Sequence, residues 1–279
     1  MGRTMERWGL RKIRLFSSDL DGTLLGNPAA TTRFRVLWES LDPKDRPLLV
    51  YNSGRLLDDM ADLLPGSGLP KADVLIGGVG TMLKAGIATE LDEEFRSFLG
   101  PQFDDGRLEP VLRDVAGIEK QPARFQHAFK SSWYLHGASP AAVKALEARL
   151  DTAGFNVKLI YSSDRDLDVL PRGADKGAAL AWLCSRLRID LDQVVVAGDT
   201  GNDASMFTLP GVRGIVVANG RAELGALVPE SKLYFHAQAA MADGVIEGLA
   251  HWGAFKASFP SNREGERPRS SNTSESCLP

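Results

Sequence analysis

The sequence contains little cysteine and no long apolar run. Its 279 residues include only two cysteines, Cys184 in an apolar stretch and Cys277 near the end, which excludes a disulfide framework and a cysteine-based zinc site. No stretch of about 18 apolar residues could cross a membrane. The first residues, MGRTMERWGLRKIRLF, are basic and lack the apolar core of a secretory signal. These absences predict a cytoplasmic protein without a membrane partner.

Positive charge is not in excess either. The chain carries 33 lysines and arginines against 36 aspartates and glutamates, a formal net charge of −3, and shows no basic stripe. Nucleic acid is therefore not expected as a partner, and an anionic ligand would need local positive charge or a metal. The length suffices to bury a large core. From about residue 256 the chain is polar and rich in proline and serine, which predicts a disordered tail at 255–279.

Short apolar runs alternate with helix-like patterns along most of the chain. This alternation predicts an α/β fold with a doubly wound parallel sheet covered on both faces. The strands are expected at 13–18, 47–52, 73–76, 193–197, 214–218 and 232–235. Between the third and fourth strands lies an alternating strand, a helix that stops at Gly154 and one or two more strands. We therefore expect a smaller α+β domain at 90–171, inserted into a core of 11–89 and 172–254.

Two carboxylates, Asp19 and Asp21, follow the first strand in the motif DLDGT. Alternate residues of a strand point to the same side, so the two can converge, and Gly22 permits a sharp turn. One carboxylate can attack phosphorus and form an aspartyl phosphate. The other can protonate the leaving alcohol and then deprotonate water. The alternative is an Asp-rich loop that caps a helix, which the motifs downstream disfavour.

The motif GDTGND follows the strand expected at 193–197. A hard cation such as Mg²⁺ takes oxygen ligands, which predicts Asp199 as a ligand and Asp203 as a second ligand or as an orienting residue. Asn202 can donate to a phosphate oxygen. Alternatively, the segment is an Asx-rich turn in which Asp203 caps the next helix, a role that is compatible with catalysis.

Two further motifs could contact an anion. NSGR closes the second strand, and the Ser53 hydroxyl and Gly54 N–H at a helix start suit a phosphate, although serine there is often only an N-cap. Lys176, in GADKGAA, is predicted to open a helix, where positive charge is unfavourable to the dipole and calls for a nearby anion. Motifs of a dinucleotide loop, a P-loop and a serine-hydrolase elbow are absent.

These motifs, in this order, resemble those of the haloacid dehalogenase (HAD) superfamily of phosphohydrolases over about residues 12–253. The insertion at the C2-type cap position, with SSDRDLDVLPRGADKGAAL, FKSSWYL and GVIEGLAHW, is similar to the sucrose-phosphate phosphatase group. The NSGR and GGVGTML loops look most like those of bacterial mannosylfructose-phosphate phosphatases. The resemblance implies a HAD core with an inserted α+β C2-type cap. It also implies a Mg²⁺-dependent phosphatase that acts on mannosylfructose phosphate or sucrose 6-phosphate, functionally paired with a glycosyltransferase synthase.

The resemblance implies a role for each matched residue. Asp19 would be the nucleophile and Asp21 the general acid and base, with Mg²⁺ held by the Asp19 carboxylate, the Asp21 carbonyl and Asp199. The residues expected to bind the phosphoryl group are Ser53, Gly54, Lys176 and Asn202. The cap residues expected to face the sugar are Lys130, Asp166 and Asp168.

Two departures from the sucrose-phosphatase pattern bear on the substrate. Ser53 replaces the usual threonine and keeps a hydroxyl, while Phe129 stands where many members carry a histidine. The loss of that histidine removes a hydrogen bond to the sugar and favours a related disaccharide phosphate. The alternatives are a general sugar-phosphate phosphatase, a phosphomutase with the same aspartyl chemistry, and a non-catalytic regulatory domain. The intact motifs argue against the last.

Overall fold

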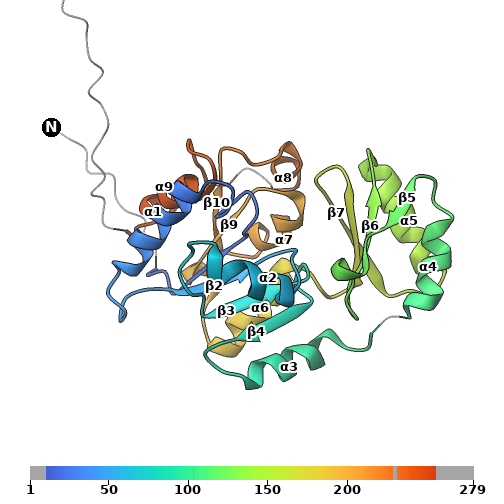
Figure 1. Cartoon of the computed structure of the whole chain (residues 1–279), viewed down its shortest axis with the longest axis horizontal. Coiled ribbons are helices and arrows are strands. Elements are labelled where there is room, and N and C mark those ends of the chain that lie inside the picture. The colour runs from blue at the N-terminus through green and yellow to red at the C-terminus, as the bar shows by residue number, and fades with distance from the viewer. Residues whose placement is uncertain (1–10, 103, 229–230, 256–279) are drawn as a thin grey trace, which may run out of the picture.

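Two units lie side by side in the computed structural model, a large one on a seven-stranded sheet and a smaller one on a four-stranded sheet (Figure 1). The structure describes residues 11–102, 104–228 and 231–255. The tail expected at 255–279 therefore lies outside the described residues from residue 256 onward. None of the helices in the described ranges is long and apolar enough to span a bilayer.

The large sheet is mostly parallel, in the order β11-β10-β9-β1-β2-β3-β4. Its strands are β1 (Leu15–Ser18), β2 (Leu48–Asn52), β3 (Val74–Gly77), β4 (Met82–Ala85), β9 (Val194–Gly198), β10 (Arg213–Val216) and β11 (Tyr234–His236). Only β4 is antiparallel to its neighbour. The six parallel strands confirm the predicted ones. The four residues of β4 follow a glycine cluster and are too few to show a period in the sequence.

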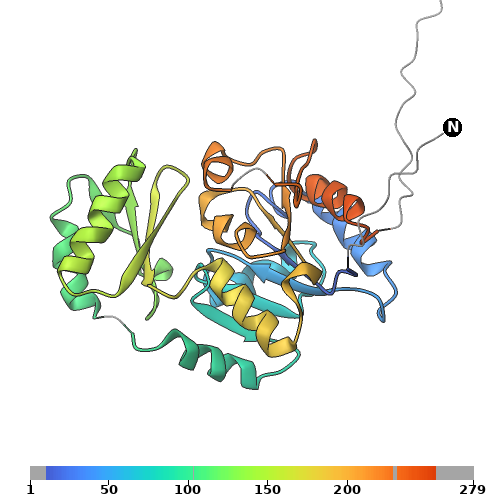
Figure 2. The same ribbon diagram turned by 180° about the vertical axis from the view of Figure 1, so that it is seen from behind.

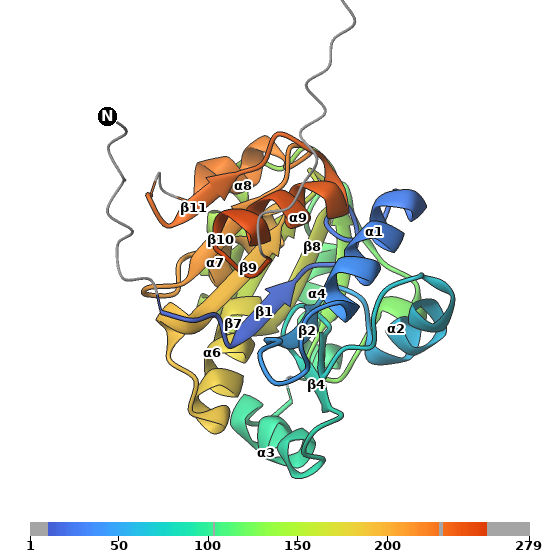
Figure 3. The ribbon, with the colours of Figure 1, turned by 90° about the vertical axis from the view of Figure 1, so that its left-hand side faces the viewer.

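The first strand lies in the middle of the sheet and gathers the motifs. Ser18, the last residue of β1, pairs with Tyr51 on one side and with Ala197 on the other, and Figure 3 shows β9, β1 and β2 next to one another. Parallel strands end at the same edge of a sheet, where α/β proteins bind their ligands. The loops that follow β1, β2 and β9 therefore meet at this edge.

Helices cover both faces of the large sheet (Figures 2 and 3). One face carries α1 (Pro28–Glu39), α2 (Leu57–Leu63) and α9 (Met241–His251), and the other carries α3 (Glu90–Leu99), α6 (Lys176–Leu187), α7 (Ala204–Phe207) and α8 (Ala222–Leu227). The side chains of neighbouring β1 residues point to opposite faces of the sheet. Leu15 packs on the face covered by α6, and Phe16 packs with Phe34 and Trp38 of α1 on the other face. Short 3₁₀ turns are η1 (Leu64–Gly66), η2 (Ala123–Phe125), η3 (Leu191–Gln193) and η4 (Gly201–Asp203).

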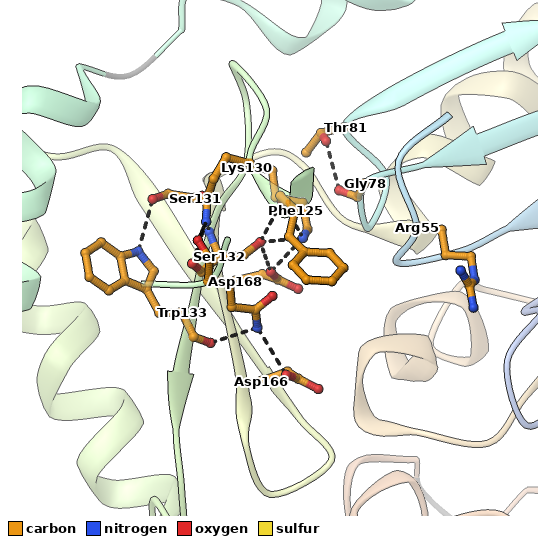
Figure 4. Close-up of polar contacts among 12 residues, drawn as sticks. Arg55, Gly78, Thr81, Phe125, Lys130, Ser131, Ser132, Trp133, Asp166 and Asp168 are labelled. Carbon is orange, nitrogen blue, oxygen red and sulfur yellow. Dashed lines mark hydrogen bonds and ion pairs between the residues drawn. The ribbon is translucent and has the colours of Figure 1, made fainter. Parts of the chain in front are cut away.

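The smaller unit, called the cap below, is an antiparallel sheet with helices on one face. Its strands, in the order β5-β6-β8-β7, are β5 (Ile118–Lys120), β6 (Ser131–Leu135), β7 (Val157–Ser162) and β8 (Asp166–Pro171), and its helices are α4 (Asp105–Arg113) and α5 (Pro140–Thr152). Trp133, Leu167 and Val169 pack with the helices. Since side chains alternate along a strand, Ser132 and Asp168 lie on the opposite face, which looks toward the large unit (Figure 4).

Helix α3 belongs to the large unit, so the cap boundary expected at residue 90 is wrong. Leu91 and Phe95 are buried in the same cluster as Leu183 of α6, and the rings of Phe95 and Trp182 meet edge-on with centroids 5.0 Å apart. The apolar stripe of an amphipathic helix shows which face is buried but not which unit covers it. The cap thus begins after Leu99.

We predict that Phe95→Ala destabilises the large unit. Phe95 is 1% exposed, and truncation of a buried phenylalanine costs about 3–5 kcal/mol of unfolding free energy. Phe98→Ala, on the same helix but at a position that is 46% exposed, should cost under ~1 kcal/mol. Urea denaturation followed by tryptophan fluorescence measures both. Equal, small losses would contradict the assignment of α3 to the large unit.

Candidate active site

Three buried carboxylates meet at the carboxyl edge of the large sheet. One oxygen from each of Asp19, Asp199 and Asp203 lies within 4.8 Å of the other two. Asp19 comes just after β1, Asp199 just after β9, and Asp203 at the end of η4. The adjacency of β1 and β9 thus brings together motifs that are far apart in the sequence.

A fully buried lysine lies between two of these carboxylates. Lys176 begins α6, as expected, and its Nζ is 2.6 Å from Oδ1 of Asp19 and 2.6 Å from Oδ1 of Asp203. Burial by itself lowers the pKa of Lys176, but the two carboxylates outweigh it and hold the pKa above its ordinary value. The lysine therefore stays charged, and the unfavourable charge at the helix start is matched by carboxylates of the protein itself.

The remaining negative charge fits a hard cation. Burial, together with the neighbouring carboxylates, raises the pKa of Asp19 to about 8 and that of Asp199 to about 7, although Lys176 acts in the opposite direction. Three carboxylates around one ammonium group leave an excess of negative charge where water is scarce. A divalent ion with oxygen ligands would remove this cost, so the donor set is consistent with metal binding.

Both carboxylate oxygens of Asp203 already accept hydrogen bonds from the protein, which leaves Asp203 less able to bind a metal than Asp19 or Asp199. Its Oδ1 accepts from Lys176, and its Oδ2 accepts from the backbone N–H groups of Asp199 and Thr200, both at 3.0 Å. Of the two roles expected for Asp203, these contacts favour the orienting one. Close packing also requires Gly22, since a Cβ there would lie 2.3 Å from Oδ2 of Asp199 and the residue has a φ of +82°.

Asp21 lies outside the buried cluster. Its carboxylate is 53% exposed, and Arg55 donates to both oxygens, from Nε to Oδ2 at 2.6 Å and from Nη2 to Oδ1 at 2.8 Å. Strand β1 ends at Ser18, so the alternation argument for Asp19 and Asp21 does not apply to the turn that they occupy. The backbone nevertheless borders the cluster, because the next residue, Gly22, touches Asp199.

The phosphate-binding residues expected from NSGR and GDTGND face each other. Ser53 is buried, and its Oγ accepts from the N–H of Arg55 at 3.2 Å, which leaves the hydroxyl hydrogen for another partner. A Cβ added to Gly54 would lie 3.7 Å from Nδ2 of Asn202. Helix α2 begins only at Leu57, so Ser53 and Gly54 do not form its N-terminus.

On the cap, Lys130 and Asp168 form a buried ion pair with an Nζ–Oδ1 distance of 2.9 Å. Ser132 Oγ donates to the same carboxylate oxygen at 2.6 Å, and Lys130 also donates to Ser132 and to the carbonyl of Phe125. Figure 4 shows this cluster on the cap face opposite Arg55, Gly78 and Thr81 of the large unit. Lys130 and Asp168, two of the three cap residues expected to face the sugar, thus lie on the cap face that looks toward the large unit (Figure 4).

Asp166 lies on the same face, outside the buried pair. It accepts from Nε2 of Gln121 at 3.1 Å and pairs with Arg165 at 3.0 Å. Sequence reasoning missed Ser132, Gln121 and Arg55. Ser132 could have been found, since it lies two residues after Lys130 in an extended segment and so shares its face. The sequence carries no comparable signal for Gln121 or for the contact of Arg55 with Asp21.

Comparison with solved structures defines the class of protein. The X-ray structure of the sucrose-phosphatase from Synechocystis sp. PCC6803 in complex with sucrose and phosphate matches with a TM-score of 0.78 and 27% identity, over 87% of this chain and 98% of that one. A HAD-superfamily phosphatase from Bacteroides thetaiotaomicron shares the fold at a TM-score of 0.64 and 13% identity, over 91% of this chain and all of that one. The expected HAD-type fold is confirmed.

The family follows from sequence comparison. The profile of the sucrose-6F-phosphate phosphohydrolase family matches residues 12–253, and the chain belongs to this family. The mannosylfructose-phosphate phosphatase of Agrobacterium fabrum (strain C58 / ATCC 33970) is 51% identical over 244 residues, 88% of this chain and 98% of that protein. Sucrose-phosphatase 1 of Nicotiana tabacum is 32% identical over 84% of this chain, which spans only 58% of that protein. The predicted resemblance is confirmed.

We predict that Mg²⁺ stabilises the protein more at pH 8 than at pH 5.5. Because the pKa values of Asp19 and Asp199 are raised in the folded state, the metal-free protein binds more protons than the unfolded chain between about pH 4 and 8 and loses stability as pH rises. Protons compete with the ion at low pH. At saturating Mg²⁺ the gain in unfolding free energy, obtained from the rise in Tm, should therefore be ~1–3 kcal/mol larger at pH 8 than at pH 5.5.

Asp199→Asn is the matched variant for this measurement, since it removes one acidic ligand at nearly constant size. It should abolish most of the Mg²⁺-dependent shift and flatten its pH dependence. Equal shifts at the two pH values, or an undiminished shift in the variant, would show that this cluster does not bind the ion.

Proposed function

We propose that the protein hydrolyses a disaccharide phosphate to the free sugar and phosphate with Mg²⁺, in the cytoplasm, and that a glycosyltransferase synthase supplies its substrate. The observation that carries this proposal is the buried Asp19–Lys176–Asp203 bridge beside Asp199. It holds a carboxylate nucleophile, a fixed positive charge and a metal-compatible donor set together at the edge of the sheet. The names of the two most informative relatives, a mannosylfructose-phosphate phosphatase and a sucrose-phosphatase with bound sucrose and phosphate, support the same chemistry.

In the first step Asp19 attacks the phosphorus. Lys176 holds Oδ1 of Asp19, which leaves Oδ2 to form the new bond while the bond from phosphorus to the sugar oxygen breaks. For this step Asp21 carries a proton, and Arg55 has released one of its two oxygens. Asp21 gives that proton to the sugar oxygen, and the sugar leaves as an alcohol. Ser53 and Asn202 donate to the phosphoryl oxygens. A Mg²⁺ ion held by Asp19 and Asp199, with the Asp21 carbonyl, would supply positive charge for those oxygens when bound.

In the second step water releases the phosphate. Asp21, now a carboxylate, takes a proton from water, the water oxygen attacks phosphorus, and the bond to Asp19 breaks, which restores the starting enzyme and frees phosphate. The location of Asp21 suits both steps, because it lies at the exposed rim of the buried cluster rather than inside it. Arg55 lies on the side of the large unit that faces the cap (Figure 4). It donates to both oxygens of the Asp21 carboxylate and so keeps it oriented.

Recognition of the sugar is assigned to the polar face of the cap. Lys130 uses its three hydrogens on Phe125, Ser132 and Asp168, so it positions these groups. Lys130 and Ser132 both contact Oδ1 of Asp168, and Oδ2 is therefore the acceptor we assign to a sugar hydroxyl, with Asp166 beside it. Phe129 is 4% exposed and offers no polar atom. This supports a disaccharide other than sucrose, with mannosylfructose phosphate as the first candidate.

We predict a strong preference among phosphate esters in a phosphate-release assay with Mg²⁺. The panel consists of mannosylfructose phosphate, sucrose 6-phosphate, trehalose 6-phosphate and hexose monophosphates. The first should lead by about tenfold or more in kcat/KM, or ~1.4 kcal/mol. Uniformly weak release would make the protein a general sugar-phosphate phosphatase, and conversion of a hexose phosphate into an isomer would make it a phosphomutase.

Asp19→Asn serves as the mechanistic control in the same assay. It should lose on the order of 10⁴-fold or more in turnover while keeping its fold. Asp45→Asn alters an exposed aspartate that pairs with Lys12 and should leave turnover unchanged. A folded, active Asp19→Asn protein would rule out the aspartyl-phosphate route.

We predict that Asp168→Asn weakens sugar recognition selectively. Loss of a charged acceptor is worth ~1.5–3 kcal/mol, so KM for the preferred disaccharide phosphate should rise about 10- to 100-fold, whereas p-nitrophenyl phosphate, which has no sugar, should be hydrolysed as before. Asp114→Asn changes a cap aspartate that pairs with Arg149 and should affect neither substrate. A similar loss on both substrates would indicate general damage to the cap.

A further inference from the structure

One carboxylate oxygen joins the cap to the loop that carries the buried aspartates. Glu223, on the short helix α8, accepts through Oε1 from the N–H of Ser163 at 2.9 Å and from the N–H of Gly201 at 2.9 Å. Ser163 lies at the tip of the β7–β8 hairpin of the cap, and Gly201 lies between Asp199 and Asp203 in the large unit. In Figure 1 the hairpin tip lies next to α8.

The local conformation on both sides suits this contact. Ser163 and Asp164 have φ values of 59° and 53°, a left-handed turn that directs the Ser163 N–H out of the hairpin instead of across it. Gly201 has no side chain to hinder the approach, since a Cβ there would lie 3.2 Å from the carbonyl oxygen of Tyr161 and 3.4 Å from Oε1 of Glu223. The cap therefore touches the loop that carries Asp199 through its hairpin tip.

The contact lies far from the linker through which the cap returns to the large unit. Lys158, near the start of β7, pairs with Asp175 at 2.5 Å, one residue before Lys176. Strand β7 has six residues, so the hairpin tip is about 20 Å from that end. A hydrogen bond at this distance from the linker opposes rotation of the cap more effectively than one beside it. When the cap opens, water can replace Glu223 as the partner of the Ser163 N–H, so this hydrogen bond can break and form again.

We propose that Glu223 is a positioning residue that latches the cap against the loop of Asp199 and so holds the sugar-binding face over the active site. This rests on the proposed function only for the choice of substrate. Hydrogen bonds to a carboxylate are roughly twice as strong as neutral ones. A single oxygen of Glu223 accepts one such bond from the cap and one from the large unit. A substrate that contacts both units needs the latch, and a phosphate ester without a sugar does not.

The test compares two substrates across three variants. Glu223→Ala should lose about tenfold or more in kcat/KM on the preferred disaccharide phosphate, mainly through KM, and several-fold less on p-nitrophenyl phosphate. Glu223→Gln keeps an acceptor oxygen and should recover much of the loss. The matched control is Glu247→Ala, because Glu247 also accepts from two backbone N–H groups, those of Gln238 and Ala239, but entirely within the large unit. It should show no substrate-dependent loss.

Hydrogen–deuterium exchange on the same proteins gives a readout independent of activity. Glu223→Ala should speed exchange in both the hairpin tip, residues 161–166, and the loop 199–203, while Glu247→Ala should change neither. Equal kinetic losses on both substrates, or unchanged exchange at the hairpin tip, would overturn the latch. If the wild-type protein hydrolyses no disaccharide phosphate, the proposed function fails instead, and exchange at the hairpin still decides the latch.

Discussion

The ion bridge of Lys176 with Asp19 and Asp203 is the constraint on which the site and the placement of the cap both depend. Taking a lysine fully out of water is costly, and a buried ion pair seldom contributes net stability. Here it joins the end of β1, the loop after β9 and the first residue of α6. Since α6 begins where the chain returns from the cap, the same lysine holds Asp19 in place and anchors the linker.

The five residues from Asp199 to Asp203 are held from two sides. Inside, Asp203 accepts from the backbone of Asp199 and from Lys176, so the loop is tied to the buried charges. Outside, Glu223 accepts from Gly201 and from the cap hairpin. A ligand that binds at Asp199 therefore acts on a loop whose position is coupled to that of the cap, which is how a small charge site can respond to closure over a large substrate.

Much of this architecture could be predicted because its signals are local. Three of the parallel strands are short apolar runs with DLDGT, NSGR or GDTGND directly behind them, and parallel strand ends share an edge, so the amino-acid sequence alone predicts that Asp19, Ser53 and Asp199 lie at one edge. Lys176 is predicted to lie near an anion only from its charge at a helix start. Pairings between distant segments could not be predicted. The hydrogen bonds from Arg55 to Asp21 depend on the path of the turn after β1. The packing of α3 depends on α6, which lies far along the chain.

Division of labour between the two units follows from the chemistry that each presents. In the proposed mechanism the buried cluster of the large unit holds and transfers the phosphoryl group, and the polar face of the cap recognises the sugar. On the cap, Lys130 contacts Phe125, Ser132 and Asp168, so its charge orients the Asp168 carboxylate. Discrimination then rests on acceptors held in fixed positions, and a site that hydrogen-bonds a hydroxyl rejects analogues that lack it far better than an apolar pocket can. Recognition of the sugar by the cap therefore affects hydrolysis only while the cap is held in a fixed position relative to the loop of Asp199.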